Sequence, residues 1–148
     1  MIHNITQYLQ RIFASILAAL AVFSFGRNMD AVSLTVENDV TDRSGAFVLE
    51  MHNDTGGKIA IDHYLTLEKK EGDTWVPVTQ YGGMIETAGT LPAGSSFRQK
   101  VDIVSLFGGY LTAGEYRVSK TYSRANIVQP QYVCTAYFTV TSVENKKR

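Results

Sequence analysis

The feature that most constrains how this chain folds is an alternating run at residues 115–122, entered through the turn signal Ala113-Gly114. Successive side chains of a β-strand point to opposite faces, so an alternation with a period of two residues predicts a strand. Gly114 permits the backbone angles of a tight entry, and Tyr116 stands just inside it. We therefore predict a tyrosine corner, in which the ring is buried and the hydroxyl bonds nearby backbone. A half-exposed tyrosine without that bond is the alternative.

Six further runs alternate in the same way and are separated by turn signals. They are residues 32–37, 46–52, 59–69, 74–79, 96–101 and 132–140. About seven short strands punctuated by turns predict an all-β fold, an antiparallel sandwich in which alternate residues of two sheets form the core. Pro77 cannot donate to a neighbouring strand, so its strand is expected at a sheet edge. Residues 38–45 are predicted to be a polar connector, and residues 91–94 a turn.

One segment breaks the strand pattern. In residues 102–109, Ile103, Leu106 and Phe107 are spaced like a single helical turn, and Asp102 ahead of them suits a helix N-cap. A pair of glycines follows, as at the end of many helices. The sequence therefore predicts one short helix between two strands.

The first thirty residues differ from the rest of the chain. Residues 12–25 are apolar apart from two serines, Arg11 precedes them, and Ser24 and Gly26 offer small side chains for a cleavage site. A basic lead, an apolar core of about 7–15 residues and a small-x-small site are typical of a secretory signal peptide. A membrane span needs about 20 apolar residues. An uncleaved membrane anchor or a buried amphipathic helix are the alternatives. The predicted organisation is a signal peptide or anchor at residues 1–30, a β-sandwich domain at 31–143 and a charged tail at 144–148.

Composition excludes several kinds of site. The 14 basic and 14 acidic residues balance, so no net field attracts nucleic acid. The single cysteine, Cys134, cannot form an internal disulfide, and its place mid-strand predicts a buried, inert thiol. His52 and His63, with Asp62 or Glu50, fit no known ligand spacing, and structural zinc needs about four ligands. We expect no metal, no cofactor and no enzymatic activity.

Three motifs, in this order and spacing, carry a family resemblance: Leu67-Glu68-Lys69-Lys70 followed by Trp75, then Leu91-Pro92-Ala93-Gly94, then Gly114-Glu115-Tyr116-Arg117. Over roughly residues 32–140 the chain resembles the bacterial Ig-like domains of exported Gram-positive proteins. The resemblance implies an Ig-like sandwich and export, and it implies no defined activity. One departure is Ala113, where many members carry a proline.

The function that follows is that of a non-catalytic exported Ig-like domain, a cell-envelope interaction or structural module. Its expected partner is an unknown protein or polysaccharide of the envelope, and nucleic acid is not expected. The localisation is extracytoplasmic, either secreted or tethered to the membrane through residues 12–25 if these are not cleaved.

Two other functions stay open. Trp75, Tyr64 and Tyr81 lie in or beside the hairpin expected at residues 59–79, and exposed rings of this kind stack on sugars, which predicts a carbohydrate-binding module. Trp75 packed over the core is the competing interpretation. The other function is a small proteinase inhibitor, suggested by fold analogy alone, which requires a protruding loop such as residues 81–90 or 123–131.

Overall fold

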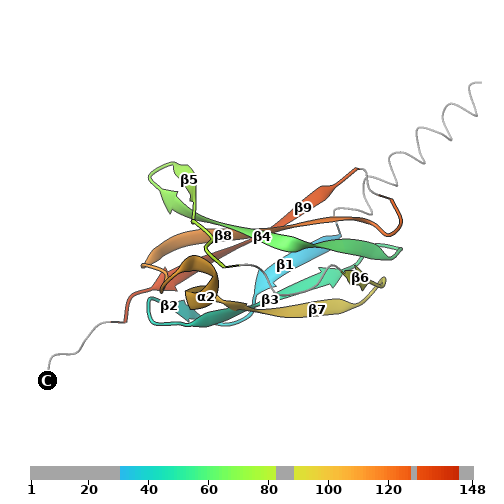
Figure 1. Ribbon diagram of the computed structural model, residues 1–148. Helices are drawn as coiled ribbons and strands as arrows, with labels where there is room; N and C mark the ends of the chain where they lie inside the picture. Colours follow the sequence, from blue (N-terminus) through green and yellow to red (C-terminus); the bar gives the residue numbers. More distant parts are fainter. Residues whose placement is uncertain (1–30, 83–88, 128–129, 144–148) are drawn as a thin grey trace, which may run out of the picture.

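The computed structural model of the protein describes residues 31–82, 89–127 and 130–143. The predicted signal peptide or anchor at residues 1–30 and the predicted tail at residues 144–148 lie outside the described residues. The described part of the chain forms nine strands and one short helix (Figure 1). In chain order these are β1 (Val32–Val36), β2 (Val40–Thr41), β3 (Ala46–Asn53), β4 (Ile59–Glu71), β5 (Thr74–Pro77), β6 (Gly89–Leu91), β7 (Ser96–Asp102), α2 (Ile103–Phe107), β8 (Gly114–Arg124) and β9 (Tyr132–Thr141).

Two facing sheets make up the fold. Strands β1, β3 and β7 form a three-stranded antiparallel sheet. The second sheet is six-stranded, with the order β2-β9-β8-β4-β5 and with β6 paired to β4 outside this path. Figure 1 shows β4 and β8 lying over β3 and β7, so the inner faces of the two sheets meet and form one core. The all-β sandwich predicted from the sequence is confirmed.

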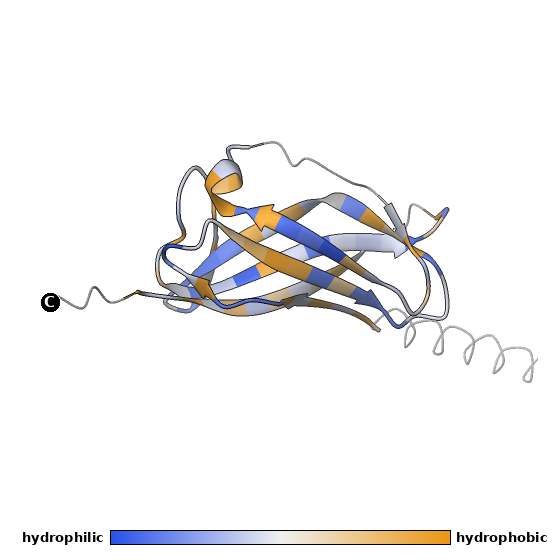
Figure 2. Ribbon diagram, turned by 90° about the horizontal axis from the view of Figure 1, so that it is seen from below, coloured by the Kyte–Doolittle hydropathy of each residue, from blue (hydrophilic) through white to orange (hydrophobic). Residues whose placement is uncertain are grey.

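Alternate residues of the long strands form the core, as the period of two predicts. In β4, Ile59, Ile61, Leu65 and Leu67 are each at most 5 % exposed. Burial of one such side chain stabilises the fold by about 1.5–3 kcal/mol. Figure 2 shows the resulting alternation of hydrophobic and hydrophilic residues along the strands. The register of β4 against β8 shifts between Ile61 and Leu65, an irregularity that the sequence pattern does not reveal.

The structure corrects the predicted number and direction of the strands. β2 lies inside the connector predicted at residues 38–45, and it pairs in parallel with β9, Val40 opposite Val140. Two residues are too few to show an alternation, although Val40 is only 3 % exposed. β6 is equally hard to detect, because its three residues run into the turn predicted at residues 91–94. The six-stranded sheet is therefore mixed rather than purely antiparallel.

The helix α2 forms where the sequence predicts a helical turn. The carboxylate of Asp102 accepts a hydrogen bond from the backbone N–H of Ser105 at 2.9 Å, and this bond holds the pKa of Asp102 below its usual value. Gly108 ends the helix with a φ of 74°, a left-handed conformation that suits glycine. Within the described residues, no helix has the length and apolar character needed to cross a membrane.

Candidate contact site beside the β4–β5 hairpin

Strands β4 and β5 form a hairpin at one edge of the six-stranded sheet, and Figure 1 shows β5 rising away from the body of the sandwich. Gly72 in its turn has a φ of 61°, a conformation that glycine adopts at little cost. The pairing sets Lys70 opposite Trp75. β5 is an edge strand, as Pro77 predicts, and it ends at that residue, two residues before the end of the predicted run. Trp75 is thus carried on a projecting element.

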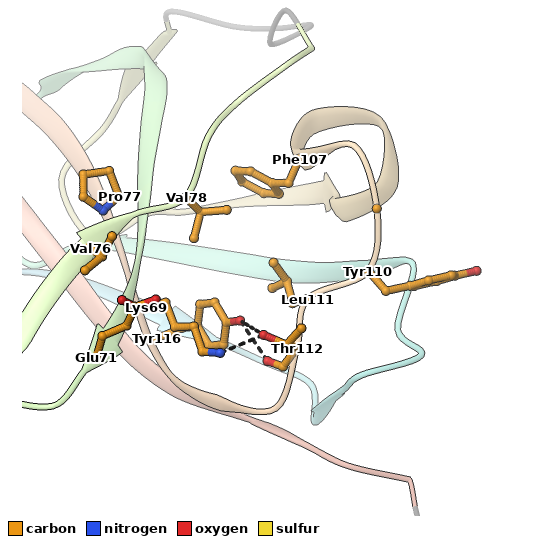
Figure 3. Close-up of a pocket in the computed structure, with 11 residues that line it drawn as sticks. Lys69, Glu71, Val76, Pro77, Val78, Phe107, Tyr110, Leu111, Thr112 and Tyr116 are labelled. Carbon is orange, nitrogen blue, oxygen red and sulfur yellow. Dashed lines mark hydrogen bonds between the residues drawn. The ribbon is translucent and has the colours of Figure 1, made fainter.

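A tyrosine corner anchors the base of this hairpin. Tyr116 is 2 % exposed, and its hydroxyl donates to the backbone carbonyl of Thr112 at 2.8 Å. Nζ of Lys69 donates to Oγ1 of Thr112 at 2.7 Å (Figure 3). Gly114 has a φ of 150°, a backbone conformation that favours glycine, and a Cβ there would lie 2.9 Å from Cε of Lys69 and displace the end of that side chain. The corner predicted from the sequence is confirmed, and it ties the loop before β8 to β4.

A small hollow of about 200 Å³ opens above the corner, between the hairpin and the connection from α2 to β8. Its apolar lining is Val76, Pro77, Val78, Phe107 and Leu111. Figure 3 shows Phe107 and Val78 turned toward one another, whereas Tyr110 points away. Lys69, Thr112 and Tyr116, which line its base, bond one another in the corner, so their polar atoms are already engaged.

The outer face of the same sheet carries an aromatic pair with a charged support. The ring centroids of Trp75 and Tyr137 lie 5.7 Å apart at 61°. The guanidinium carbon of Arg117 lies 4.8 Å from the centre of the Trp75 ring, a cation–π distance. Glu68 holds that guanidinium by two hydrogen bonds, with Nη2 to Oε1 at 3.0 Å. We call Glu68, Trp75, Arg117 and Tyr137 the outer-face cluster.

Ion pairs keep the cluster in place. The hydrogen bonds from Arg117 hold the pKa of Glu68 below its usual value, and the same bonds raise the pKa of Arg117. Both groups therefore stay charged around neutral pH. The bidentate contact fixes the plane of the guanidinium, so the cation that contacts the Trp75 ring is held in one orientation. Next to it, Nζ of Lys70 lies 3.0 Å from a carboxylate oxygen of Glu115.

A shallow hollow of about 370 Å³ opens between Trp75 and Tyr137. Its lining combines rings with ionic and hydroxyl groups: Lys70, Trp75, Glu115, Tyr116, Tyr137, Phe138 and Thr139. Tyr137 is 66 % exposed, so a partner can reach its ring. An apolar group can stack on the rings while its polar atoms bond Lys70 and Glu115 at the rim.

The structure separates the three aromatic residues that the sequence singled out. Trp75 joins Tyr137 on the outer face instead of packing over the core. Tyr64 lies six residues before Lys70 on β4, and its side chain is 66 % exposed. Tyr81 is 75 % exposed, and its ring lies beside Gly108, where an added Cβ would be 3.0 Å from the ring.

Sequence reasoning missed Tyr137 and Arg117. Both stand on the outward parity of their strands, which is a usable signal. Their contact with Trp75 depends on the register of four strands, which sets Glu68 opposite Arg117 and Arg117 opposite Tyr137, and no local pattern gives that register. The inhibitor loops expected at residues 81–90 and 123–131 are only partly described, because residues 83–88 and 128–129 fall outside.

The remaining reactive groups do not assemble into a metal site in the described part of the chain, where no three His, Cys, Asp or Glu side chains gather closely enough. Cys134 is 7 % exposed, as predicted, and burial raises the pKa of its thiol to about 11. His52 bonds Ser96 and Asp54. The side chain of His63 lies outside the described residues.

Comparison with known proteins decides the family. The sequence profile described as "Bacterial Ig-like domain" matches residues 28–139. The chain belongs to the bacterial Ig-like domain family. The resemblance drawn from the three motifs is thereby confirmed, and domains of this kind are generally structural or interaction modules rather than enzymes.

No curated protein matches the sequence. Among solved structures, the chain is similar to the ASH/PapD-like domain of human CEP192 (PapD-like domain 7), with 10 % identity and a TM-score of 0.38. That match covers 77 % of this chain and 87 % of the other.

Proposed function

We propose that the protein is an exported Ig-like module of the cell envelope that acts by contact, through the outer-face cluster. The observation that carries the proposal is the pair of Trp75 and Tyr137 beside an open hollow of about 370 Å³. Trp, Tyr and Arg are the residue types most enriched where binding energy is concentrated. Here they are held together before any partner arrives, which lowers the entropy lost on binding.

Export is supported by the apolar run at residues 12–25 behind Arg11 and by family membership, since bacterial Ig-like domains are commonly extracellular. Fractionation of the source cells, with an intact mass of the recovered protein, tests it. A mature chain that starts near Arg27 or Val32, outside the membrane, is the expected result. A full-length chain in the membrane fraction supports the anchor instead, and a full-length chain in the cytoplasm contradicts export.

The contact site is tested by cross-linking in intact source cells, with the protein carrying a photoreactive group at residue 139 on the rim of the hollow. We expect one discrete cross-linked product, which Trp75→Ala and Tyr137→Ala each reduce at least tenfold. Tyr110→Ala is the matched control, because that side chain is 62 % exposed but lies on the other side of the hairpin. Equal yields from Trp75→Ala and Tyr110→Ala would contradict the proposal.

A carbohydrate is the second candidate partner, favoured by the two rings that wall the hollow and the ionic groups at its rim. Trp75 is the only tryptophan, so its fluorescence reports directly on that wall. Addition of soluble peptidoglycan fragments, cello-oligosaccharides or chito-oligosaccharides should shift its emission with saturation. The shift should vanish in Tyr137→Ala and persist in Tyr64→Ala and Tyr81→Ala. No saturable shift with any of the three would leave a protein partner.

A further inference from the structure

At the opposite face of the molecule, the imidazole of His52 bonds one side chain on each ring nitrogen. Nδ1 lies 2.7 Å from Oγ of Ser96, and Nε2 lies 2.9 Å from Oδ1 of Asp54. His52 stands near the end of β3, Asp54 follows in the turn, and Ser96 opens β7. The register of β3 and β7 sets His52 directly opposite Ser96. The three side chains therefore form a continuous hydrogen-bonded serine–histidine–aspartate triad.

The donors in this triad follow from the chemistry of a neutral imidazole beside a carboxylate. A carboxylate only accepts hydrogen bonds, so Nε2 of His52 carries the proton and donates it to Asp54. In the neutral ring Nδ1 then holds a lone pair, and the hydroxyl of Ser96 donates to it. This is the arrangement that activates a serine, with the two ring nitrogens exchanged relative to the usual order. A triad is recognised by geometry and roles rather than by sequence order.

Buried neighbouring residues hold the triad in place. Asn53 and Thr55, on either side of Asp54, are at most 5 % exposed. The backbone N–H of Asn53 donates to the carbonyl of Ser95 at 3.0 Å, next to the facing pair of His52 and Ser96. The nucleophile and its base are thus mounted on paired strands, which position side chains more accurately than loops do. Ser96 is exposed on the outward face of β7, so a substrate can reach its hydroxyl.

We propose that Ser96, His52 and Asp54 form an acyl-transfer site that accepts carboxylic esters with small, accessible acyl groups. Oγ of Ser96 attacks the ester carbonyl carbon while Nδ1 of His52 takes the hydroxyl proton. The C–O bond to the alcohol then breaks, and His52 returns the proton to the departing alkoxide. Water repeats the sequence on the acyl-serine and releases the carboxylic acid. This goes beyond the proposed contact function and beyond the sequence-based expectation of no activity.

The surroundings predict a slow reaction. The nearest cation that β7 adds to this face is Arg98, two residues and about 7 Å along the strand from Ser96. Its guanidinium is held by Glu37 at 2.8 Å and faces Glu50 at 3.8 Å. Stabilisation of a developing oxyanion is therefore weak, and the rate gain comes mainly from the general base, a factor of about 100 to 10 000. Strongly activated esters are the substrates on which this is measurable.

The first test is covalent labelling of the full chain with an alkyl fluorophosphonate, which serine attacks at phosphorus with loss of fluoride. We expect one adduct in the intact mass, located by peptide mapping at Ser96. Ser96→Ala should abolish it. Ser33→Ala is the matched control, because Ser33 faces His52 from β1 in the same register and no hydrogen bond joins them in the structure. No adduct, or an adduct that survives Ser96→Ala, would overturn the proposal.

The second test assigns the roles of His52 and Asp54. Hydrolysis of p-nitrophenyl acetate should fall about 100-fold in His52→Gln, with the fold checked by thermal melting. Asp54 acts through His52, so it is a positioning residue: Asp54→Ala should slow hydrolysis, and Asp54→Glu should restore part of the rate. Nitrogen NMR should show the Nε2–H tautomer of His52 in the native protein and a mixture in Asp54→Ala. Unchanged rates in His52→Gln would refute the general base.

Discussion

Asn53, at one end of the sandwich, and Lys120, midway along β8, are both buried polar side chains, and they differ in how their polar atoms are satisfied. Asn53 is fully buried. Its Nδ2 donates to the carbonyls of Gly57 and Leu91 at 2.9 and 3.0 Å. Its Oδ1 accepts from the backbone N–H of Thr55 at 3.0 Å and from the Thr55 hydroxyl at 2.6 Å. An amide can make no more bonds than these.

Lys120 is 3 % exposed and projects between the sheets. Within the described residues its Nζ donates one hydrogen bond, to Oε1 of Gln99 at 3.2 Å, and it has no carboxylate within ion-pair distance. Loss of hydration lowers the pKa of Lys120. A neutral group with every bond made stabilises a fold, whereas a cation with one neutral partner costs free energy. Burial alone does not give the sign of a polar residue's contribution.

The largest effect is expected from Asn53→Ala. It leaves the carbonyl of Leu91 and the N–H of Thr55 without their partners in a dry site, each costing about 1–3 kcal/mol. We expect the free energy of unfolding in urea to fall by about 3–5 kcal/mol. Asn38→Ala is the matched control, because the bonds of Asn38 are exposed and their loss should cost less than about 1 kcal/mol. Equal losses of unfolding free energy in Asn53→Ala and Asn38→Ala would contradict the contrast between buried and exposed amide bonds.

Lys120→Met should act in the opposite direction. The substitution keeps an unbranched side chain of nearly the same length and removes the buried charge, so we expect the free energy of unfolding at pH 7 to rise by about 1–3 kcal/mol. Lys100→Met, on the exposed parity of β7, should stay within about 0.5 kcal/mol. A loss of stability in Lys120→Met would mean that the bond to Gln99 outweighs the lost hydration.

The pH dependence of that gain follows from the direction of the pKa shift. The folded state lowers the pKa of Lys120 below its usual 10.5, so the unfolded chain binds the extra proton in the window between the two values. The native protein should therefore gain stability relative to Lys120→Met as pH rises through this window toward 10.5. Urea unfolding of both proteins at several pH values measures the difference, in which other titrations cancel. A constant difference would show that the fold leaves the pKa of Lys120 unchanged, with its ammonium group still hydrated.

The contrast between these two regions also shows what sequence can predict. The alternation in residues 115–122 correctly set Lys120 on the same face as Tyr116 and Val118, but it did not say that the middle of this face is dry. Asn53, Asp54 and Thr55 precede two glycines, a pattern that indicates a turn and no more. In the structure the Asn53 amide is completely buried and fully hydrogen-bonded, so it stabilises the fold. Periodicity reports the face of a residue, while depth depends on which strands lie across from it.

The same limit applies to the candidate site. The sequence predicted the hairpin, the edge position of Pro77 and the tyrosine corner, because each rests on a local signal. It did not predict that Trp75 would meet Tyr137 across Arg117, because that contact joins β5, β8 and β9. Nor did it connect Ser96 with His52, 44 residues apart, since only the register of β3 and β7 brings them together.

The smallest change in stability is expected from Tyr116→Phe, between the loss expected for Asn53→Ala and the gain expected for Lys120→Met. The hydroxyl of Tyr116 is a neutral donor with one backbone partner, Thr112, and it opens on a hollow that water can enter. Water can therefore replace part of the lost bond, and we expect a loss of about 1 kcal/mol in urea unfolding. Tyr110→Phe, on the same connection but 62 % exposed, should change stability by less than about 0.5 kcal/mol. A loss near that of Asn53→Ala would mean that water does not reach the Tyr116 hydroxyl. The tyrosine corner would then be as dry as the Asn53 turn.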